Sequence, residues 1–535
     1  MNHLLCGLAA NPALPSALLD QLLARALAEG PEAADGPLDL DAEELVRALV
    51  QRPDLGRARA RTLAAREEST AVQLAYDGQL DADDVDPAAW PVAAVALLDA
   101  GAHRPEWARL LAAHPDPRVR WRLASCPGLP PDVTETLAAD PDTGVVAELA
   151  LWTTAEVADR LARHPHAEVR YAAALNQAVT PAALAALITG EGLDPAVSCL
   201  VCDGEDVPFT HHPWDPDPEP ERQLRPDASC EGGHGSTVAE TRARAARNPA
   251  TPAAAAACLA AHPQMSVRWD LAERSDLPQE VYARLAEDPE PRVRATAAGN
   301  PAIGVDLVRS LAASDEKEVR RALAHHPGLP LDVLAHLAHT TRPGPAVLPR
   351  IAAATPGELA GLAASPHAVV RKLVARRHDL PAELRDALAA DPDASVVASV
   401  APHPGLSEEQ LRSMVAAHGD RVAAPVAANP DAPSALLVEL ARQEPPVPRA
   451  LRAVAAHPHA TAEALRPCLA DAKAGPIAAA HPALPPALLV ALLDGGDERL
   501  AEAAAGNPSL PVATMRELTA RCARWTEPGV TRPVS

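Results

Sequence analysis

A block of 26 residues that repeats along this chain constrains its fold more than any other feature. Asn248-Pro-Ala-Thr-Pro252 recurs as Arg274-Ser-Asp-Leu-Pro278, Asn300-Pro-Ala-Ile-Gly304 and His326-Pro-Gly-Leu-Pro330, and each step is 26 residues. A self-similar period of this length is typical of stacked supersecondary units. We therefore expect one elongated array of repeats rather than several globular domains.

Each repeat carries two short helical patterns. In one clear unit, Val281 and Leu285 lie four residues apart, and so do Val293 and Ala297. This spacing places each pair on one face of a helix. Asn300-Pro marks the end of the unit, because the residue before a proline is pushed out of the helical region. Helices this short are unstable alone, so stacking must bury their apolar faces. The sequence predicts an all-α fold.

The order of motifs within the unit resembles a known repeat family. It reads Asn/His-Pro-x-Leu-Pro, then Leu-x-x-Leu-Ala, then Asp-Pro-x-x-x-Val-Arg, most clearly at 112–180 and 245–520. This resembles the bacterial leucine-rich repeat variant (LRV) family and is similar to HEAT-like scaffolds. The resemblance implies a right-handed α-solenoid whose units pair an α-helix with a 3₁₀-like helix. Because the units here are longer than that family's, we expect some second helices to be α-helical.

The repeat also predicts where segments begin and end. We expect divergent N-terminal helical repeats over 1–111, solenoid repeats over 112–198 and 237–522, and a C-terminal tail over 523–535. Residues 199–236 break the period and are expected to form an inserted Cys/His loop that binds a metal.

Composition narrows the classes of partner and compartment. The net charge is -23, which disfavours diffuse binding to nucleic acid or anionic membranes. No apolar run is long enough to span a bilayer, and the N-terminus lacks a signal-peptide pattern, so we expect a cytoplasmic protein. The eight cysteines are then thiols or metal ligands rather than disulfides. Arginine greatly outnumbers lysine, which suggests a GC-rich bacterial genome.

The interruption holds the strongest candidate site. Cys199 and Cys202 form a Cys-x2-Cys pair, and Cys230 and His234 form a Cys-x3-His pair. The polar, proline-rich run between them cannot fold by apolar burial, and a metal is the usual substitute inside a cell. Three thiolates and one imidazole favour structural zinc, with His211 or His212 as a substitute or additional ligand.

Other interpretations of this loop stay open. Cys230-Glu-Gly-Gly-His234 resembles the Cys-Asp-Gly-Ser-His end of a small two-iron family, which would imply an iron–sulfur cluster. That family opens with Cys-x-Cys and has a much shorter gap, so we favour zinc. A redox Cys-x2-Cys pair would explain neither Cys230 nor His234. A loop with incidental thiols is the remaining alternative.

Arginines recur at one phase of the repeat: Arg120, Arg170, Arg268, Arg294, Arg320 and Arg371. Stacked, they could form a basic stripe that binds phosphates. Pairing with acids such as Asp288, or with helix-end carbonyls, is the interpretation we favour.

Histidine and asparagine interchange before proline. The histidines are His114, His164, His262, His326, His403, His457 and His481, and the asparagines include Asn248, Asn300 and Asn429. This interchange predicts a hydrogen-bonding, structural role. Cys126 occupies the same position in the repeat, directly before a proline. Cys258 and Cys468 fall in helical patterns, and we expect all three cysteines to be buried.

No phosphate loop, nucleophile elbow or His-Glu-x-x-His motif occurs. We therefore expect a non-enzymatic scaffold that binds a protein partner and carries a zinc-stapled loop. One alternative is a redox or iron–sulfur protein whose solenoid presents the cluster. Another is a nucleic-acid binder that uses the arginine stripe. The oligomeric state stays open.

Overall fold

The computed structural model describes residues 2–27, 40–196, 237–341 and 344–523. Within these ranges it contains 35 α-helices, two short 3₁₀ helices and no β-strand. The helices recur as stacked pairs, which confirms the predicted α-solenoid. The inserted loop at 199–236, with all four predicted metal ligands, lies outside the described residues.

The chain divides into two compact units. Unit 1 comprises Met1–Leu80, Pro345–Val347 and Ala354–Ser535, and unit 2 comprises Asp81–Gly344 and Leu348–Ala353. Unit 1 therefore contains both ends of the chain.

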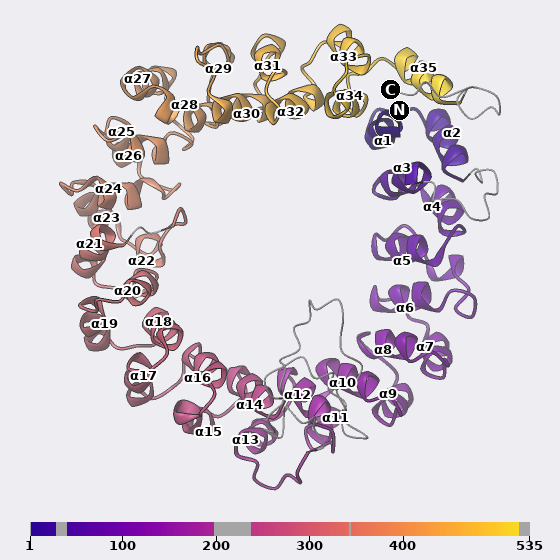
Figure 1. Ribbon diagram of the computed structural model, residues 1–535, viewed down its shortest axis with the longest axis vertical. Coiled ribbons are helices and arrows are strands. Elements are labelled where there is room, and N and C mark those ends of the chain that lie inside the picture. Colours follow the sequence, from indigo (N-terminus) through magenta and orange to yellow (C-terminus); the bar gives the residue numbers. More distant parts are fainter. Residues whose placement is uncertain (1, 28–39, 197–236, 342–343, 524–535) are drawn as a thin grey trace, which may run out of the picture. The chain divides into compact units, whose positions relative to one another are not determined.

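Unit 2 is a two-layered arc of helix pairs (Figure 1). The first helix of each pair lies in the outer layer: α7 (Pro105–Ala112), α9 (Pro131–Ala138), α11 (Ala155–Leu161), α13 (Pro181–Thr189), α15 (Ala253–Ala257) with η2 (Cys258–Ala261), α17 (Gln279–Ala286), α19 (Val305–Ala312) and α21 (Leu331–Thr340). The second helices form the inner layer: α6 (Pro91–Asp99), α8 (Pro117–Ala124), α10 (Thr143–Trp152), α12 (Ala167–Leu175), α14 (Thr237–Arg247), α16 (Met265–Ala272), α18 (Pro291–Gly299) and α20 (Lys317–Leu323). Unit 2 also contains η1 (Ala82–Asp84) and α22 (Pro349–Ala352). The second helices are α-helical, unlike the 3₁₀-like helices that the family resemblance implies.

Unit 1 has the same two layers. Its first helices are α2 (Ser16–Leu27), α4 (Arg57–Ala64), α23 (Pro356–Ala363), α25 (Ala382–Ala389), α27 (Glu408–His418), α29 (Ser434–Ala441), α31 (Ala462–Cys468), α33 (Pro486–Leu493) and α35 (Val512–Ala523). Its second helices are α1 (Asn2–Ala10), α3 (Leu40–Val50), α5 (Glu68–Tyr76), α24 (Ala368–Ala375), α26 (Ala394–Val400), α28 (Asp420–Ala427), α30 (Pro448–Ala456), α32 (Ala474–Ala480) and α34 (Glu498–Ala505).

One repeat of unit 1 is assembled from the two ends of the chain. Helix α35 follows α34 as the first helix of a repeat, and α1 takes the place of that repeat's second helix. Helix α1 packs against α34 on one side and α3 on the other, and it also contacts α35. Helix α2 in turn packs against α35. We call α35 and α1 the split repeat.

Three of the four residues in the predicted apolar pairs form the core, whereas Val281 is only half-buried. Leu285 and Ala297 are fully buried, as are Val293 and the ring of Tyr282. Proline occupies the first turn of helices such as α18, where its missing N–H costs no helical hydrogen bond. Several of the short helices thus begin at proline, and apolar contacts to the same layer and to the facing layer hold them in place.

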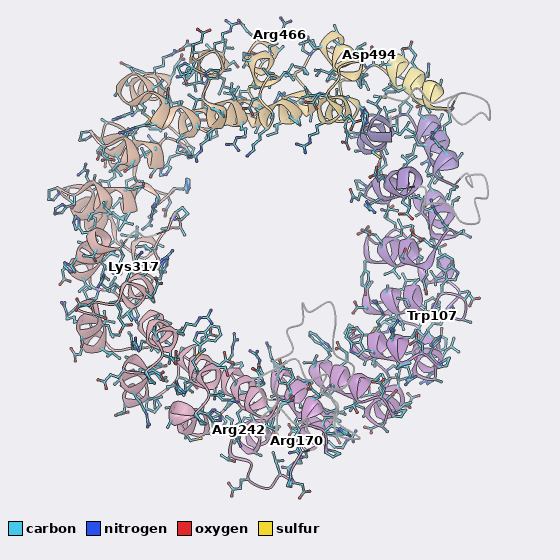
Figure 2. All side chains as sticks on the ribbon, in the orientation of Figure 1. Trp107, Arg170, Arg242, Lys317, Arg466 and Asp494 are labelled. Atoms are coloured by element: carbon cyan, nitrogen blue, oxygen red, sulfur yellow. The ribbon has the colours of Figure 1, made fainter. Side chains whose placement is uncertain are left out.

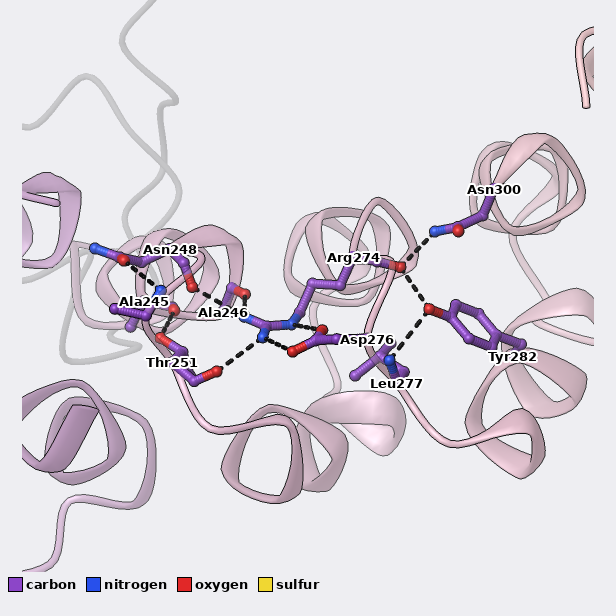
Figure 3. A network of polar contacts seen from close by, with 10 residues as sticks. Ala245, Ala246, Asn248, Thr251, Arg274, Asp276, Leu277, Tyr282 and Asn300 are labelled. Atoms are coloured by element: carbon purple, nitrogen blue, oxygen red, sulfur yellow. Dashed lines mark hydrogen bonds and ion pairs between the residues drawn. The ribbon is translucent and has the colours of Figure 1, made fainter. Parts of the chain in front are cut away.

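The residue that ends each repeat, here called the anchor, bonds the repeat to the one before it. The Asn300 amide donates to the main-chain oxygens of Ala272, at 2.7 Å, and of Arg274, at 2.5 Å. Its oxygen accepts from the amide of Ala302. Figure 3 shows Asn300 reaching the main-chain oxygen of Arg274. The anchor therefore satisfies carbonyls that the end of the preceding second helix leaves without a partner.

In other repeats, a histidine or an arginine contacts the main-chain oxygens of the preceding repeat. The Nε2 atom of His457 lies 2.8 Å from the main-chain oxygen of Asn429, and its Nδ1 accepts from the amide of His459. The Arg274 guanidinium donates to the main-chain oxygens of Ala246 and Asn248 (Figure 3). These contacts confirm the predicted hydrogen-bonding role for Asn300 and His457, and they show that arginine serves as an anchor as well.

An arginine anchor also needs a counter-charge. Arg274 pairs with Asp276 at 2.5 Å, and Arg377 pairs with Asp379 at 2.6 Å. Arg52 and Asp54 form the same kind of ion pair. The Arg52 guanidinium also donates to the main-chain oxygens of Ala9 and Asn11, at the end of α1. The motif Arg-x-Asp is thus a third form of the anchor.

Two expectations about individual residues were wrong. His114, His164 and His262 lie at the break between the first and second helices, not at the anchor; His164, for example, follows α11 and precedes α12. The dipeptide His-Pro occurs both between the two helices of a repeat and at the end of a repeat. The sequence alone does not distinguish the two positions. Cys258, at the start of η2, is exposed rather than buried, whereas Cys126 and Cys468 are buried as predicted.

Candidate binding surface

The ladder arginines are bonded inside the array. Arg268 forms an ion pair with Asp288 of the next repeat at 2.7 Å and donates to the main-chain oxygen of His262. Arg120 with Asp140, and Arg371 with Asp391, repeat the ion pair. These contacts confirm the interpretation of the ladder as inter-repeat pairing. The side chains of Asp140, Asp288 and Asp391 are each 4% exposed. These ion pairs therefore lie inside the array and do not form a basic stripe on its surface.

A different surface of the second helices is open. Helix α8 contacts α6 and α10 in its own layer and α7 in the outer layer, and the remaining side of the helix is exposed. The same holds for the helices that follow it in unit 2. We call the exposed side chains of α8, α10, α12, α14, α16, α18 and α20 the inner face (Figure 1).

Aromatic residues recur at one phase of these second helices, exposed at Trp121 and half-buried at Tyr171 and Trp269. Trp121, Tyr171 and Trp269 each lie five residues before an anchor, at Cys126, Asn176 and Arg274 respectively. Trp121 is 44% exposed, in a chain whose aromatic content is only 2%. The corresponding sequence signal is an aromatic residue directly after three of the Val-Arg pairs, which begin at Val119, Val169 and Val267.

Two of these rings are held by neighbours in adjacent helices. The Trp269 indole donates a 2.8 Å hydrogen bond to the hydroxyl of Thr296 on α18. The Arg292 guanidinium, also on α18, lies over the Trp269 ring at 5.3 Å from its centroid. This distance suits a cation–π contact. On the other side, burial acts to lower the pKa of Arg244 on α14, but the neighbouring Tyr171 side chain and nearby carboxylates raise it.

Asp270 lies buried at the centre of this group. Its carboxylate is 3.5 Å from Arg244 and 3.7 Å from Arg247, both on α14. Burial is the main cause that raises the pKa of Asp270, to about 6, although both arginines oppose the shift. The carboxylate thus links α14 to α16 beneath the exposed side chains.

The inner face carries mostly positive charge, although the whole chain is strongly acidic. Among the described residues of its seven helices, six exposed side chains are basic and one is acidic. The basic ones are Arg118, Arg122, Arg247, Arg292, Lys317 and Arg321, and the acidic one is Glu318. Figure 2 marks Lys317 on α20, and in unit 1 it marks Arg466 on the outer helix α31. The surface therefore combines an exposed ring with cations.

The predicted metal ligands Cys199, Cys202, Cys230 and His234 lie outside the described residues, as do His211 and His212. Across the described ranges, no group of three or more His, Cys, Asp or Glu side chains is placed to hold a metal. None of the helices described is long and apolar enough to cross a bilayer.

Comparison with known proteins finds similarity to a solved structure alone. No protein-family model and no curated protein matches the sequence. Among solved structures, the chain is similar to a leucine-rich repeat variant with a novel repetitive protein structural motif. The identity is 22%, the match covers 50% of this chain and 75% of that one, and the TM-score is 0.19. The name of that structure is that of the repeat family that the sequence pattern resembles.

Proposed function

We propose that this protein is a non-enzymatic scaffold that binds an acidic segment of a protein partner along the inner face of unit 2. The observation that carries the proposal is the excess of exposed basic side chains around Trp121 on α8. Repeat arrays bind their partners on extended concave surfaces of this kind.

The chemistry of the surface suits such a segment. Trp121 lies between Arg118 and Arg122 in sequence, so one ring and two cations project from a single short helix. Aromatic and arginine side chains are the residue types that most often dominate binding energy at protein interfaces. The cations would speed association with an acidic segment and orient it.

Selection of peptides from a displayed random library on immobilised full-length protein tests the proposal. We expect the selected peptides to be rich in Asp and Glu with at least one apolar residue, and to bind more weakly as salt rises. The double variant Arg118→Glu/Arg122→Glu should lose most of this binding. Arg466→Glu changes an exposed arginine on the outer helix α31 and is the matched control. Selected peptides without acidic enrichment, or equal binding to the double variant, would contradict the proposal.

A DNA duplex measured in parallel separates the nucleic-acid alternative. If the inner face bound phosphates in general, the duplex would bind as tightly as the peptides and lose affinity in the same double variant. We expect much weaker binding of the duplex, because the ladder arginines are already paired within the array.

We further propose that Cys199, Cys202, Cys230 and His234 bind structural zinc. Support comes from the sequence alone: three thiols and an imidazole at ligand spacings in a stretch with few apolar residues. Metal analysis of purified protein should give one zinc per chain, and Cys202→Ser and Cys230→Ser should each lower it sharply. Cys468→Ser, which changes a buried helical cysteine, should leave it unchanged. A brown protein containing iron would favour the iron–sulfur alternative, and no bound metal would refute both.

A further inference from the structure

The split repeat is completed by two segments that no short stretch of chain connects. Helix α35 supplies its first helix, and α1 supplies its second helix and its anchor, Asn11. The Asn11 amide donates to the main-chain oxygens of Ala505, at 2.9 Å, and of Asn507, at 2.7 Å. This is the bond pattern of an interior boundary, where Asn507 donates to the oxygens of Ala479 and His481.

The boundary between α1 and α34 is also tightly packed and apolar. A Cβ atom on Gly7 would collide with the main-chain oxygen of Glu502 and lie 2.9 Å from the Cβ of Ala505. Leu4, Leu5 and Leu8 of α1 are buried. Without the split repeat, the stacking faces of α34 and of α3 would lose these contacts.

We propose that this boundary is also an interaction surface for a second copy of the chain. Helix α1 of one copy docks on α34 and α35 of another and completes the split repeat head to tail. Every contact that holds α1 in place is available equally from a second copy, because α1 and α34 are connected only through the rest of the chain. This is the heterologous type of interface, in which different surfaces of two identical chains meet.

Concentration decides between the two arrangements. A chain's own α1 is held near α34 by the remainder of the chain, so its docking is an intramolecular event that does not depend on protein concentration. Dilute protein should therefore complete its own split repeat. Concentrated protein, and above all protein refolded at high concentration, should exchange α1 between copies.

Cross-linking of two distinguishable full-length chains tests the exchange. His3 and Glu498 approach to 3.8 Å across the boundary, so cysteines at these positions suit a short bismaleimide. One chain carries His3→Cys and the other Glu498→Cys, and both carry Cys258→Ser to remove an exposed thiol. After refolding the two together, we expect a covalent dimer whose yield rises with protein concentration, with a cross-linked peptide spanning positions 3 and 498.

Two controls make the outcome decisive. Gly7→Val in the first chain should lower the dimer yield several-fold, because the added side chain meets α34. Gly361→Val, on α23 of the same unit, should not, since an added Cβ there has no atom within 4 Å. A chain with both cysteines should cross-link within itself at every concentration. Internal cross-linking with no mixed dimer at any concentration would overturn the exchange, and no internal cross-linking would overturn the split repeat itself.

Discussion

The Asn11 amide donates a 2.7 Å hydrogen bond to the main-chain oxygen of Asn507, although 496 positions separate the two residues in sequence. Elsewhere in the array, anchors about one repeat apart make the same bond; Asn429, for instance, donates to the main-chain oxygen of His403, 26 positions away. The two ends of the chain thus meet as ordinary neighbours within unit 1.

Replacing an interior anchor should destabilise its boundary. Asn429→Ala would leave the main-chain oxygens of Ala401 and His403 without their donor, and we expect a loss of about 1–3 kcal/mol in the free energy of unfolding. Asn429→His should lose less, because histidine serves as the anchor at positions 457 and 481. Urea unfolding measures both. Equal losses in the two variants would contradict the donor role.

Truncating a core leucine should affect one unit. Leu285 is fully buried on α17, so Leu285→Ala should cost about 2–5 kcal/mol. Leu110→Ala on α7 is the control, since Leu110 is 49% exposed and its loss should cost under about 0.5 kcal/mol. Hydrogen exchange should accelerate mainly in the helices next to α17. A uniform acceleration in both units would contradict nearest-neighbour packing.

Acid should weaken unit 1 through His403. Burial is the main cause that lowers the pKa of His403, to about 4, and His378 and Arg385 add to the shift. The unfolded chain has a pKa near 6.5 at this residue, so it binds a proton first as the pH falls. The contribution of neutral His403 to stability is therefore present above pH 6.5 and is lost between pH 6.5 and about 4.

The variant His403→Asn isolates this contribution. Asparagine is a natural anchor and does not titrate, so the variant should lose less stability than the parent between pH 7 and pH 4. His325→Asn, which changes an exposed histidine just after α20, is the matched control. Urea midpoints across this range provide the comparison, and identical profiles for His403→Asn and the parent would contradict the assignment.

Cysteine labelling should follow burial. Burial is the main cause that raises the thiol pKa of Cys126 to about 12 and that of Cys468 to about 11, and alkylation requires the thiolate. At pH 8, iodoacetamide should label the exposed Cys258 in the folded protein and the other two only after unfolding. Peptide mass spectrometry resolves the three sites. Labelling of Cys468 as fast as Cys258 would show that α31 opens readily.

The sequence predicted what repeats locally. Val293 and Ala297 were assigned to one buried face because helical spacing alone decides it, and both are fully buried. The interchange of Asn and His at the anchors predicted a hydrogen-bonding role, because both side chains offer a donor and an acceptor at similar distances from the main chain. Asp276, by contrast, was not recognised as the partner of Arg274, because a single arginine anchor looks like a degenerate repeat.

The long-range features could not be predicted in the same way. Each repeat presents similar apolar faces, so nothing in the pattern states that α1 stacks on α34. The inner face was missed for a different reason. Trp121 and Trp269 share one phase of the repeat but lie several repeats apart, and the sequence does not show which side of their helices the neighbouring helices leave uncovered.

The anchors bind main-chain oxygens, which every residue possesses whatever its side chain. A repeat can therefore change most of its sequence and still be held by the anchor of the next one. Asn507 would bond to any preceding repeat whose second helix ends in the same way. Gene duplication, loss or transposition of a whole 26-residue block would then leave every junction chemically intact, so the length of such an array can evolve independently of the surface it displays.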